Sequence, residues 1–180
     1  LSRRFDRAAV EGGWARQGYI SALSLAEWDE RDRHRWSYRV IADRIRKYAV
    51  RPAADLRRLF LRMAFNMLVR NTDDHARNHG FLGEPDGLVL SPLFDVEPAL
   101  TRRGVGSEFN LAMSVGDQGR LAARENLLSS AAAFNLDASE AEELLRDMRD
   151  CVGASWRDAL GEAGFGAPAL DRLAPSFGHT

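Results

Sequence analysis

The chain has 180 residues, 45% of them hydrophobic and 28% charged, which suits one buried core with a hydrated surface. Its net charge of −1 argues against a strongly basic nucleic-acid-binding surface. A single cysteine, Cys151, excludes an internal disulfide or a multi-cysteine zinc site and is typical of a reduced, cytoplasmic protein. No apolar run approaches the roughly 20 residues that span a bilayer, so we expect no membrane segment.

The first half of the chain predicts a turn followed by two helices. Glu11-Gly12-Gly13 is typical of a turn. Ser37 can cap a helix whose apolar residues recur at helical spacing, and Arg51-Pro52 ends it. We expect Asp55 to cap a second helix over Leu56–Val69. Apolar residues cover more than one face of this second helix, which predicts that it is buried on most sides.

The middle of the chain predicts a small β-hairpin. Gly80–Leu82 and Leu88–Leu90 flank a turn over Gly83–Gly87. Residues 16–21 fit either a short strand or a loop. A hairpin brings its two ends together, so residues just before and just after it are expected to lie close in space.

The remainder predicts helices. One helix is expected over about Leu121–Phe134. Asp137 with Glu140 forms a capping-box-like start for a long helix, in which Cys151 is expected to be a small core residue. The fold class is therefore mainly α, with one small hairpin.

Polar residues concentrate on either side of the hairpin. The segment Asn71–Phe81 contains Asp73-x-x-x-x-Asn78, which has the spacing of a protein-kinase catalytic loop. A second acidic residue, Asp95, ends the segment Ser91-Pro92-Leu93-Phe94-Asp95 just beyond the hairpin. We therefore expect Asp73, Asn78 and Asp95 to converge.

These three side chains suit phosphoryl transfer from ATP. Asp73 would accept the proton of the attacking hydroxyl. Asn78 and Asp95 would hold Mg²⁺, which prefers hard oxygen ligands, with Asp95 the principal ligand. Arg77 would offset negative charge near phosphate if it points into the site.

Two other interpretations fit the same residues. Asp and Asn after a helix commonly form turns and caps. A divalent-metal hydrolase could use Asp73, Asp74, His75 and His79 as a mixed carboxylate and histidine site. The two histidines would share a face only on a helix, and the Asn and Gly content of the segment argues against one there.

The segment Asn71–Leu82 resembles the catalytic loop of the HipA-type serine/threonine kinases, the toxin components of bacterial toxin–antitoxin pairs. Ser91–Asp95 is similar to that family's substitute for the D-F-G motif, and Arg4-Phe5-Asp6-Arg7 resembles its interlobe segment. The resemblance covers nearly the whole chain. It implies the helical C-terminal lobe of a protein-kinase-like fold, with residues 1–7 as the interlobe segment, residues 8–180 as the lobe and a hairpin carrying the site.

The resemblance also implies roles for single residues. Asp73 would be the catalytic base, and Asn78 and Asp95 the Mg²⁺ ligands. The residues that would contact ATP are Phe5 beside the adenine, His75, Ala76, Arg77 and Asn78 along the phosphates, and Phe94 with Asp95. The implied partners are a helix-turn-helix antitoxin (HipB-like) and a protein substrate such as a glutamyl-tRNA synthetase, with DNA bound only indirectly through the antitoxin.

One departure from the family concerns the phosphate-binding loop and the strand lysine, which have no match within the 180 residues. Because Leu1 opens the chain mid-pattern, we expect a fragment from which the N-terminal lobe is absent. We therefore expect these residues alone to be inert or very weak as a kinase. The alternative is a non-catalytic split or degenerate lobe that binds an antitoxin or an N-terminal partner chain.

Overall fold

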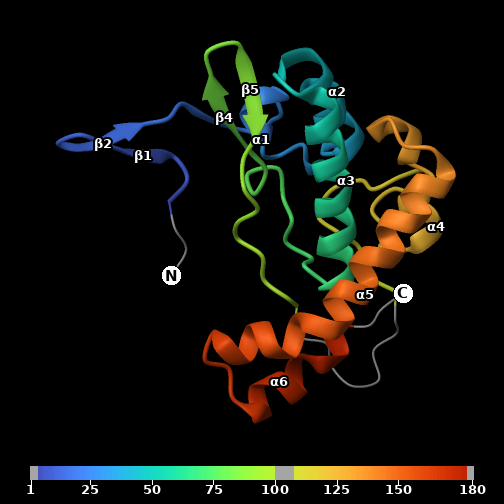
Figure 1. Cartoon of the computed structure of the whole chain (residues 1–180). Helices are drawn as coiled ribbons and strands as arrows, with labels where there is room; N and C mark the ends of the chain where they lie inside the picture. Colours follow the sequence, from blue (N-terminus) through green and yellow to red (C-terminus); the bar gives the residue numbers. More distant parts are fainter. Residues whose placement is uncertain (1–3, 100–107, 178–180) are drawn as a thin grey trace.

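The structure, a computed structural model, describes residues 4–99 and 108–177. Three long helices form most of the body, and short strands lie at one end of it (Figure 1). The prediction of a mainly α fold with a small hairpin is confirmed at this level. The long helices are α2 (Tyr38–Tyr48), α3 (Pro52–Leu68) and α5 (Ala138–Glu162).

Helix α3 lies at the centre of the core and packs against both α2 and α5. Its side chains are buried around most of its circumference, as predicted, and include Leu56, Leu59, Phe60 and Met63. Burying these side chains removes apolar surface from water, which is the main favourable term in folding. The helix therefore serves as the scaffold for the segments that precede and follow the hairpin.

The start of α3 differs from the prediction, and its end shows how the polar loop begins. The helix begins at Pro52, not after Asp55, because a proline at the first position lacks only an N–H that would have no partner there. Arg70 adopts a left-handed conformation (φ 54°) just beyond the helix. The Arg70 N–H donates to the Met67 carbonyl, and the Asn71 N–H donates to the Asn66 carbonyl. These bonds satisfy carbonyls of the last turn and end the helix, so the polar loop begins at Asn71.

The hairpin of β4 (Gly80–Glu84) and β5 (Gly87–Leu90) is confirmed, and a third strand, β3 (Tyr19–Ser21), pairs antiparallel with β4. A separate hairpin of β1 (Arg7–Val10) and β2 (Gly13–Arg16) turns at Glu11 and Gly12, as predicted. This second hairpin projects from the body (Figure 1), and its residues are mostly exposed.

The expected single helix over Leu121–Phe134 is wrong. This stretch instead forms a short helix, α4 (Arg124–Leu128), and a separate 3-10 turn, η2 (Ala131–Phe134). The residues before Arg124 form a loop because the side-chain amide of the buried Asn126 donates to the Gly119 and Leu121 carbonyls. The other short elements are α1 (Ala22–Leu25), η1 (Arg33–Arg35), α6 (Ala167–Leu173) and η3 (Ala174–Ser176).

The capping box at the start of α5 is confirmed, since Asp137 accepts from the Glu140 N–H and Glu140 accepts from the Asp137 N–H. The expectation that Cys151 is a core residue is wrong: it lies on the exposed face of α5. The buried side chains of α5 are Ala141, Leu144, Leu145 and Val152. None of the described helices combines the length and apolarity of a membrane span.

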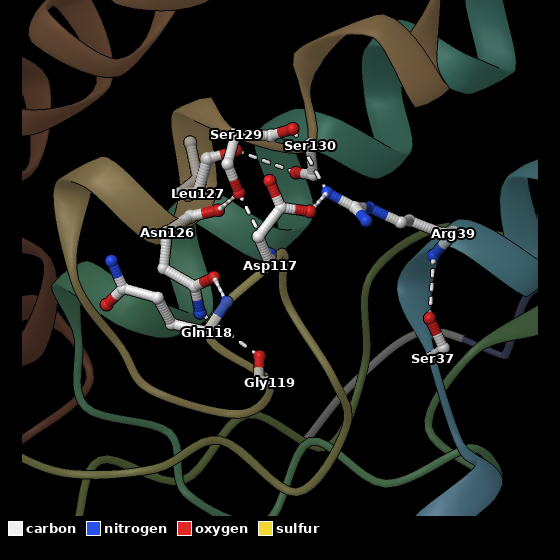
Figure 2. Close-up of polar contacts among 9 residues, drawn as sticks. All are labelled: Ser37, Arg39, Asp117, Gln118, Gly119, Asn126, Leu127, Ser129 and Ser130. Carbon is white, nitrogen blue, oxygen red and sulfur yellow. Dashed lines mark hydrogen bonds and ion pairs between the residues drawn. The ribbon is translucent and has the colours of Figure 1, made fainter.

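A compact polar network fixes the turn before α4 (Figure 2). Arg39 of α2 donates to the Asp117 carboxylate (2.7 Å) and to the Ser129 carbonyl (3.0 Å). Asn126 accepts from the Gln118 N–H at 2.7 Å. A Cβ at Gly116 would overlap the Asn126 backbone and the Ser129 hydroxyl, so the close approach requires glycine there.

Candidate active site

The loop from Asn71 to His79 follows α3 and is held by its own backbone and by α1. The Asn78 side-chain amide donates to the Asp73 carbonyl at 3.1 Å, and the His75 N–H donates to the same carbonyl at 2.8 Å. The N–H groups of Ala22 and Leu23, at the start of α1, donate to the carbonyls of His79 and Ala76. The loop therefore brings Asp73 and Asn78 together, as predicted.

The carboxylates of Asp73 and Asp95 are both exposed, and neither has a hydrogen bond or ion pair with any side chain or backbone group in residues 4–99 and 108–177. The Ser91 N–H donates to the Gly80 carbonyl at 2.9 Å, so the two polar segments leave the same end of the hairpin. Asp95 adopts a left-handed conformation (φ 56°), which is uncommon outside glycine and often occurs at functional sites.

The donor set suits a hard cation. Asp73 and Asp95 offer free carboxylate oxygens, and Asn78, whose amide nitrogen is bonded to Asp73, keeps its Oδ1 available. Mg²⁺ is commonly held by one or two carboxylates together with waters and phosphate oxygens. By chemical type, these three side chains are therefore suitable ligands for Mg²⁺.

An aromatic group lies beside this end of the hairpin. The rings of Phe5 and Phe94 lie 5.4 Å apart between centroids, and Phe5 lies 6.3 Å from Tyr19. Phe5 and Phe94 were both predicted as nucleotide contacts, whereas Tyr19 was not. Its signal in the sequence was weak, since one aromatic residue in a three-residue strand carries no motif. Tyr19 packs over Gly80, where a Cβ would overlap its ring.

The other predicted contacts differ in what they can offer a ligand. Ala76 is fully buried, and its carbonyl accepts from the Leu23 N–H, so it has no exposed surface to offer a ligand. Arg77 is exposed and forms an ion pair with Glu30. His75 is half-buried, and its Nδ1 is buried without a hydrogen-bond partner among the described residues.

Two loop residues point into the protein rather than toward the candidate site. Asp74 is fully buried and accepts from the Tyr38 hydroxyl at 2.5 Å and from the Ala112 N–H at 2.7 Å. Burial raises the pKa of Asp74 to about 7, although both hydrogen bonds oppose the change. His79 lies edge-on to the Tyr38 ring at 5.2 Å, and burial, followed by the nearby Arg62 charge, lowers its pKa well below the usual value.

This arrangement does not support the rival metal-hydrolase site. Both oxygens of Asp74 are occupied by protein donors, and His79 is enclosed in the core. Within the described part of the chain, no group of three or more His, Cys, Asp and Glu side chains is arranged to hold a metal ion. The predicted set of Asp73, Asp74, His75 and His79 is therefore not brought together.

Comparisons with known proteins identify a family and a similar fold. The family model described as HipA-like C-terminal domain matches residues 1–156. The fold is similar to a chain in the solved structure of the Shewanella oneidensis MR-1 toxin–antitoxin system HipA, HipB and its operator DNA complex, with a TM-score of 0.70 and 16% sequence identity. That match covers 96% of this chain and 45% of the Shewanella chain, so this chain spans less than half the length of the protein it resembles. No curated protein matches the sequence.

Proposed function

Because the chain belongs to the HipA-like C-terminal domain family, we propose that it supplies the catalytic loop and the metal-binding aspartate of an ATP- and Mg²⁺-dependent serine/threonine protein kinase of the HipA toxin type. One observation carries the proposal. Two exposed carboxylates, Asp73 and Asp95, without partners in the described residues, flank the same end of one hairpin beside an aromatic group. Such an arrangement suits a polyphosphate with a cation and a flat base.

Each residue has a role in this proposal. Asp73 orients the attacking serine or threonine hydroxyl and accepts its proton. Asn78 and Asp95 hold Mg²⁺, which would offset the charge on the phosphate oxygens when bound. Phe5 and Phe94 give the adenine an apolar surface to pack against. His75 and Arg77 would line the phosphates, and Ala76, which is fully buried, would hold the loop between them.

The proposed partners follow from the family and the similar structure. The solved relative includes HipA, HipB and operator DNA, so we propose a HipB-like helix-turn-helix antitoxin as partner and DNA contact only through it. The substrate would be a cytoplasmic protein, of which a glutamyl-tRNA synthetase is one candidate. Co-purification of the whole polypeptide with a HipB-like helix-turn-helix protein would test the first of these partners.

The activity can be tested with the whole polypeptide that the gene encodes and, in parallel, with the 180 residues alone. We expect Asp73→Asn to reduce γ-phosphate transfer by about 10²–10⁴-fold while ATP binding changes little, because a general base acts in the transition state. We expect Asp95→Ala to weaken Mg²⁺-dependent ATP binding by at least about 10-fold, measured by calorimetry with and without Mg²⁺.

Asp86→Ala is the matched control, because Asp86 is an exposed carboxylate at the other end of the same hairpin. It should change neither quantity. Mg²⁺-dependent binding that survives Asp95→Ala would remove the proposed metal role. If the whole polypeptide binds ATP without transferring phosphate, the non-catalytic binding module becomes the better account. Robust transfer by the 180 residues alone would contradict the expectation that they are weak.

A further inference from the structure

A buried carboxylate follows directly after the proposed catalytic base. Asp73 is exposed, whereas Asp74 has 0% of its surface exposed and cannot reach a substrate. Placing a carboxylate in the interior is costly unless donors surround it. Asp74 has one donor on each oxygen, and the two donors come from different parts of the fold: the Tyr38 hydroxyl on α2 and the Ala112 N–H.

Tyr38 is itself held by α3 and by the start of the loop. The Asn66 amide donates to the Tyr38 hydroxyl at 3.0 Å, and the Asn71 amide donates to Asn66 Oδ1 at 3.1 Å. The buried chain of hydrogen bonds thus runs from Asn71, where the loop begins, through α3 and the phenol to Asp74. It ties the loop to the core at two points, on either side of Thr72 and Asp73.

The second donor is also fixed. The segment that contains Ala112 is bonded to its surroundings through the Leu111 N–H to the Arg120 carbonyl and the Ser114 N–H to the Trp36 carbonyl, both at 2.9 Å. Just beyond it, the network of Figure 2 holds the turn from Gly116 to Gly119. The Ala112 N–H is therefore a donor in a constrained segment, not in a free loop.

We propose that Asp74 and Tyr38 are positioning residues: their buried hydrogen bond, together with the Ala112 N–H, fixes the loop so that Asp73 faces outward at a set position. The proposal rests on the kinase function proposed above. Neither residue would touch ATP, the metal or the substrate. Loss of the bond would let Asp73 shift, and displacements of about 1 Å can cost on the order of 10²-fold in rate.

Two substitutions in the whole polypeptide test this role. Tyr38→Phe removes the hydroxyl that donates to Asp74. Asp74→Asn replaces one acceptor oxygen with an NH₂ group, which cannot accept from the Tyr38 hydroxyl or the Ala112 N–H that it would face. We expect each to lower kcat by about 10–100-fold while KM for ATP·Mg²⁺ changes less than about 3-fold. The double variant should lose no more than the worse single variant, because both substitutions break one connected unit.

Phe134→Leu is the control for destabilisation alone. Phe134 is a core residue on η2, packed against Phe60 and outside the proposed site. It should lower the unfolding temperature and leave kcat at 25 °C unchanged. Unchanged kcat in Tyr38→Phe and Asp74→Asn, or losses that multiply in the double variant, would overturn the positioning role.

Hydrogen exchange of the loop amides separates this proposal from the proposed function. Both test variants should accelerate exchange from Asp73 to Asn78, and Phe134→Leu should not. If the parent protein transfers no phosphate, the kinase proposal fails, and exchange alone decides whether Asp74 and Tyr38 fix the loop. Exchange that is unchanged in the variants would overturn the positioning proposal in either case.

Discussion

At position 79 an imidazole lies inside the protein, with 1% of its surface exposed and neither ring nitrogen hydrogen-bonded to the described residues. It packs edge-on against Tyr38, near the buried Arg62 guanidinium. Burial and this positive charge keep the imidazole neutral in the folded protein. His79 therefore behaves as a core aromatic residue that also carries a titratable group.

The lowered pKa of His79 predicts a pH dependence of stability. The unfolded chain takes up a proton at His79 below about pH 6.5, and the folded protein does not, so acid favours unfolding. The contribution of His79 to the unfolding free energy is fully present above that pH. It decreases as pH falls, by at most about 1.4 kcal/mol per pH unit. Denaturant titrations from pH 7 to 5 should show that the unfolding free energy of His79→Leu rises relative to that of the parent protein as pH falls.

Replacement of the exposed His34 with Asn is the matched control for the loss of an imidazole. Asp74, whose raised pKa acts in the opposite direction, is present in every variant, so its contribution largely cancels from the comparison. An identical pH slope in His79→Leu and the parent protein would contradict the prediction.

Among the elements, α3 connects both sides of the hairpin through buried polar side chains. Asp55 accepts from the Leu90 N–H at 3.0 Å, Arg62 donates to the Ser91 carbonyl at 2.6 Å, and Asn66 supports Tyr38. Burial lowers the pKa of Arg62 to about 10, and it remains charged at neutral pH. The helix thereby fixes the point at which the chain leaves β5 toward Asp95.

Substitution of Asp55 tests this connection between α3 and β5. Asp55→Ala leaves the buried Leu90 N–H without an acceptor, which should cost about 1–3 kcal/mol of unfolding free energy and speed exchange of the Leu90 amide. Asp55→Asn keeps an acceptor oxygen and should cost less. Asp43→Ala, on the exposed face of α2, should stay within about 0.5 kcal/mol of the parent. Equal losses in Asp55→Ala and Asp43→Ala would show that this bond does not stabilise the fold.

Over the whole molecule, one apolar core joins helices that are distant in the sequence. Phe60 of α3 and Phe134 of η2 meet edge to face, with ring centroids 5.6 Å apart and planes at 63°. The β1–β2 hairpin lies apart from this core (Figure 1). Trp14, which belongs to β2, is 65% exposed. Stability should therefore depend strongly on the first pair and weakly on the hairpin.

A double-mutant cycle measures this difference. Phe60→Leu and Phe134→Leu should each destabilise the protein, and their combination should reveal a coupling of about 0.5–1.5 kcal/mol from the lost ring contact. Phe60→Leu combined with Trp14→Leu should be additive within about 0.5 kcal/mol. Denaturant unfolding at 25 °C gives each value. Additivity between the two phenylalanines would mean that the rings do not interact energetically.

Features that depend on neighbouring residues were predictable from the sequence. Ser37 and the Asp137–Glu140 capping box mark helix starts because their side chains bond to N–H groups two or three residues away. The spacing of Asp73 and Asn78 also predicted that they lie close together, and the Asn78 side-chain amide donates a hydrogen bond to the Asp73 carbonyl. Asp55 was wrongly predicted to be a helix cap, whereas it lies inside α3 and accepts a hydrogen bond from Leu90 of β5. An aspartate near a helix start is the same in the sequence in both cases.

The sequence by itself determined the helical class, the hairpin, the family resemblance and the candidate residues Asp73, Asn78 and Asp95. Only the tertiary structure decided that Asp73 faces outward while Asp74 faces inward, and that Phe5 meets Phe94. The physical reason is that the hydrogen bonds of helices, caps and tight turns join residues close in the sequence, whereas burial depends on which distant segments pack together. Two adjacent aspartates are alike in the sequence until Tyr38 and Ala112 surround one of them.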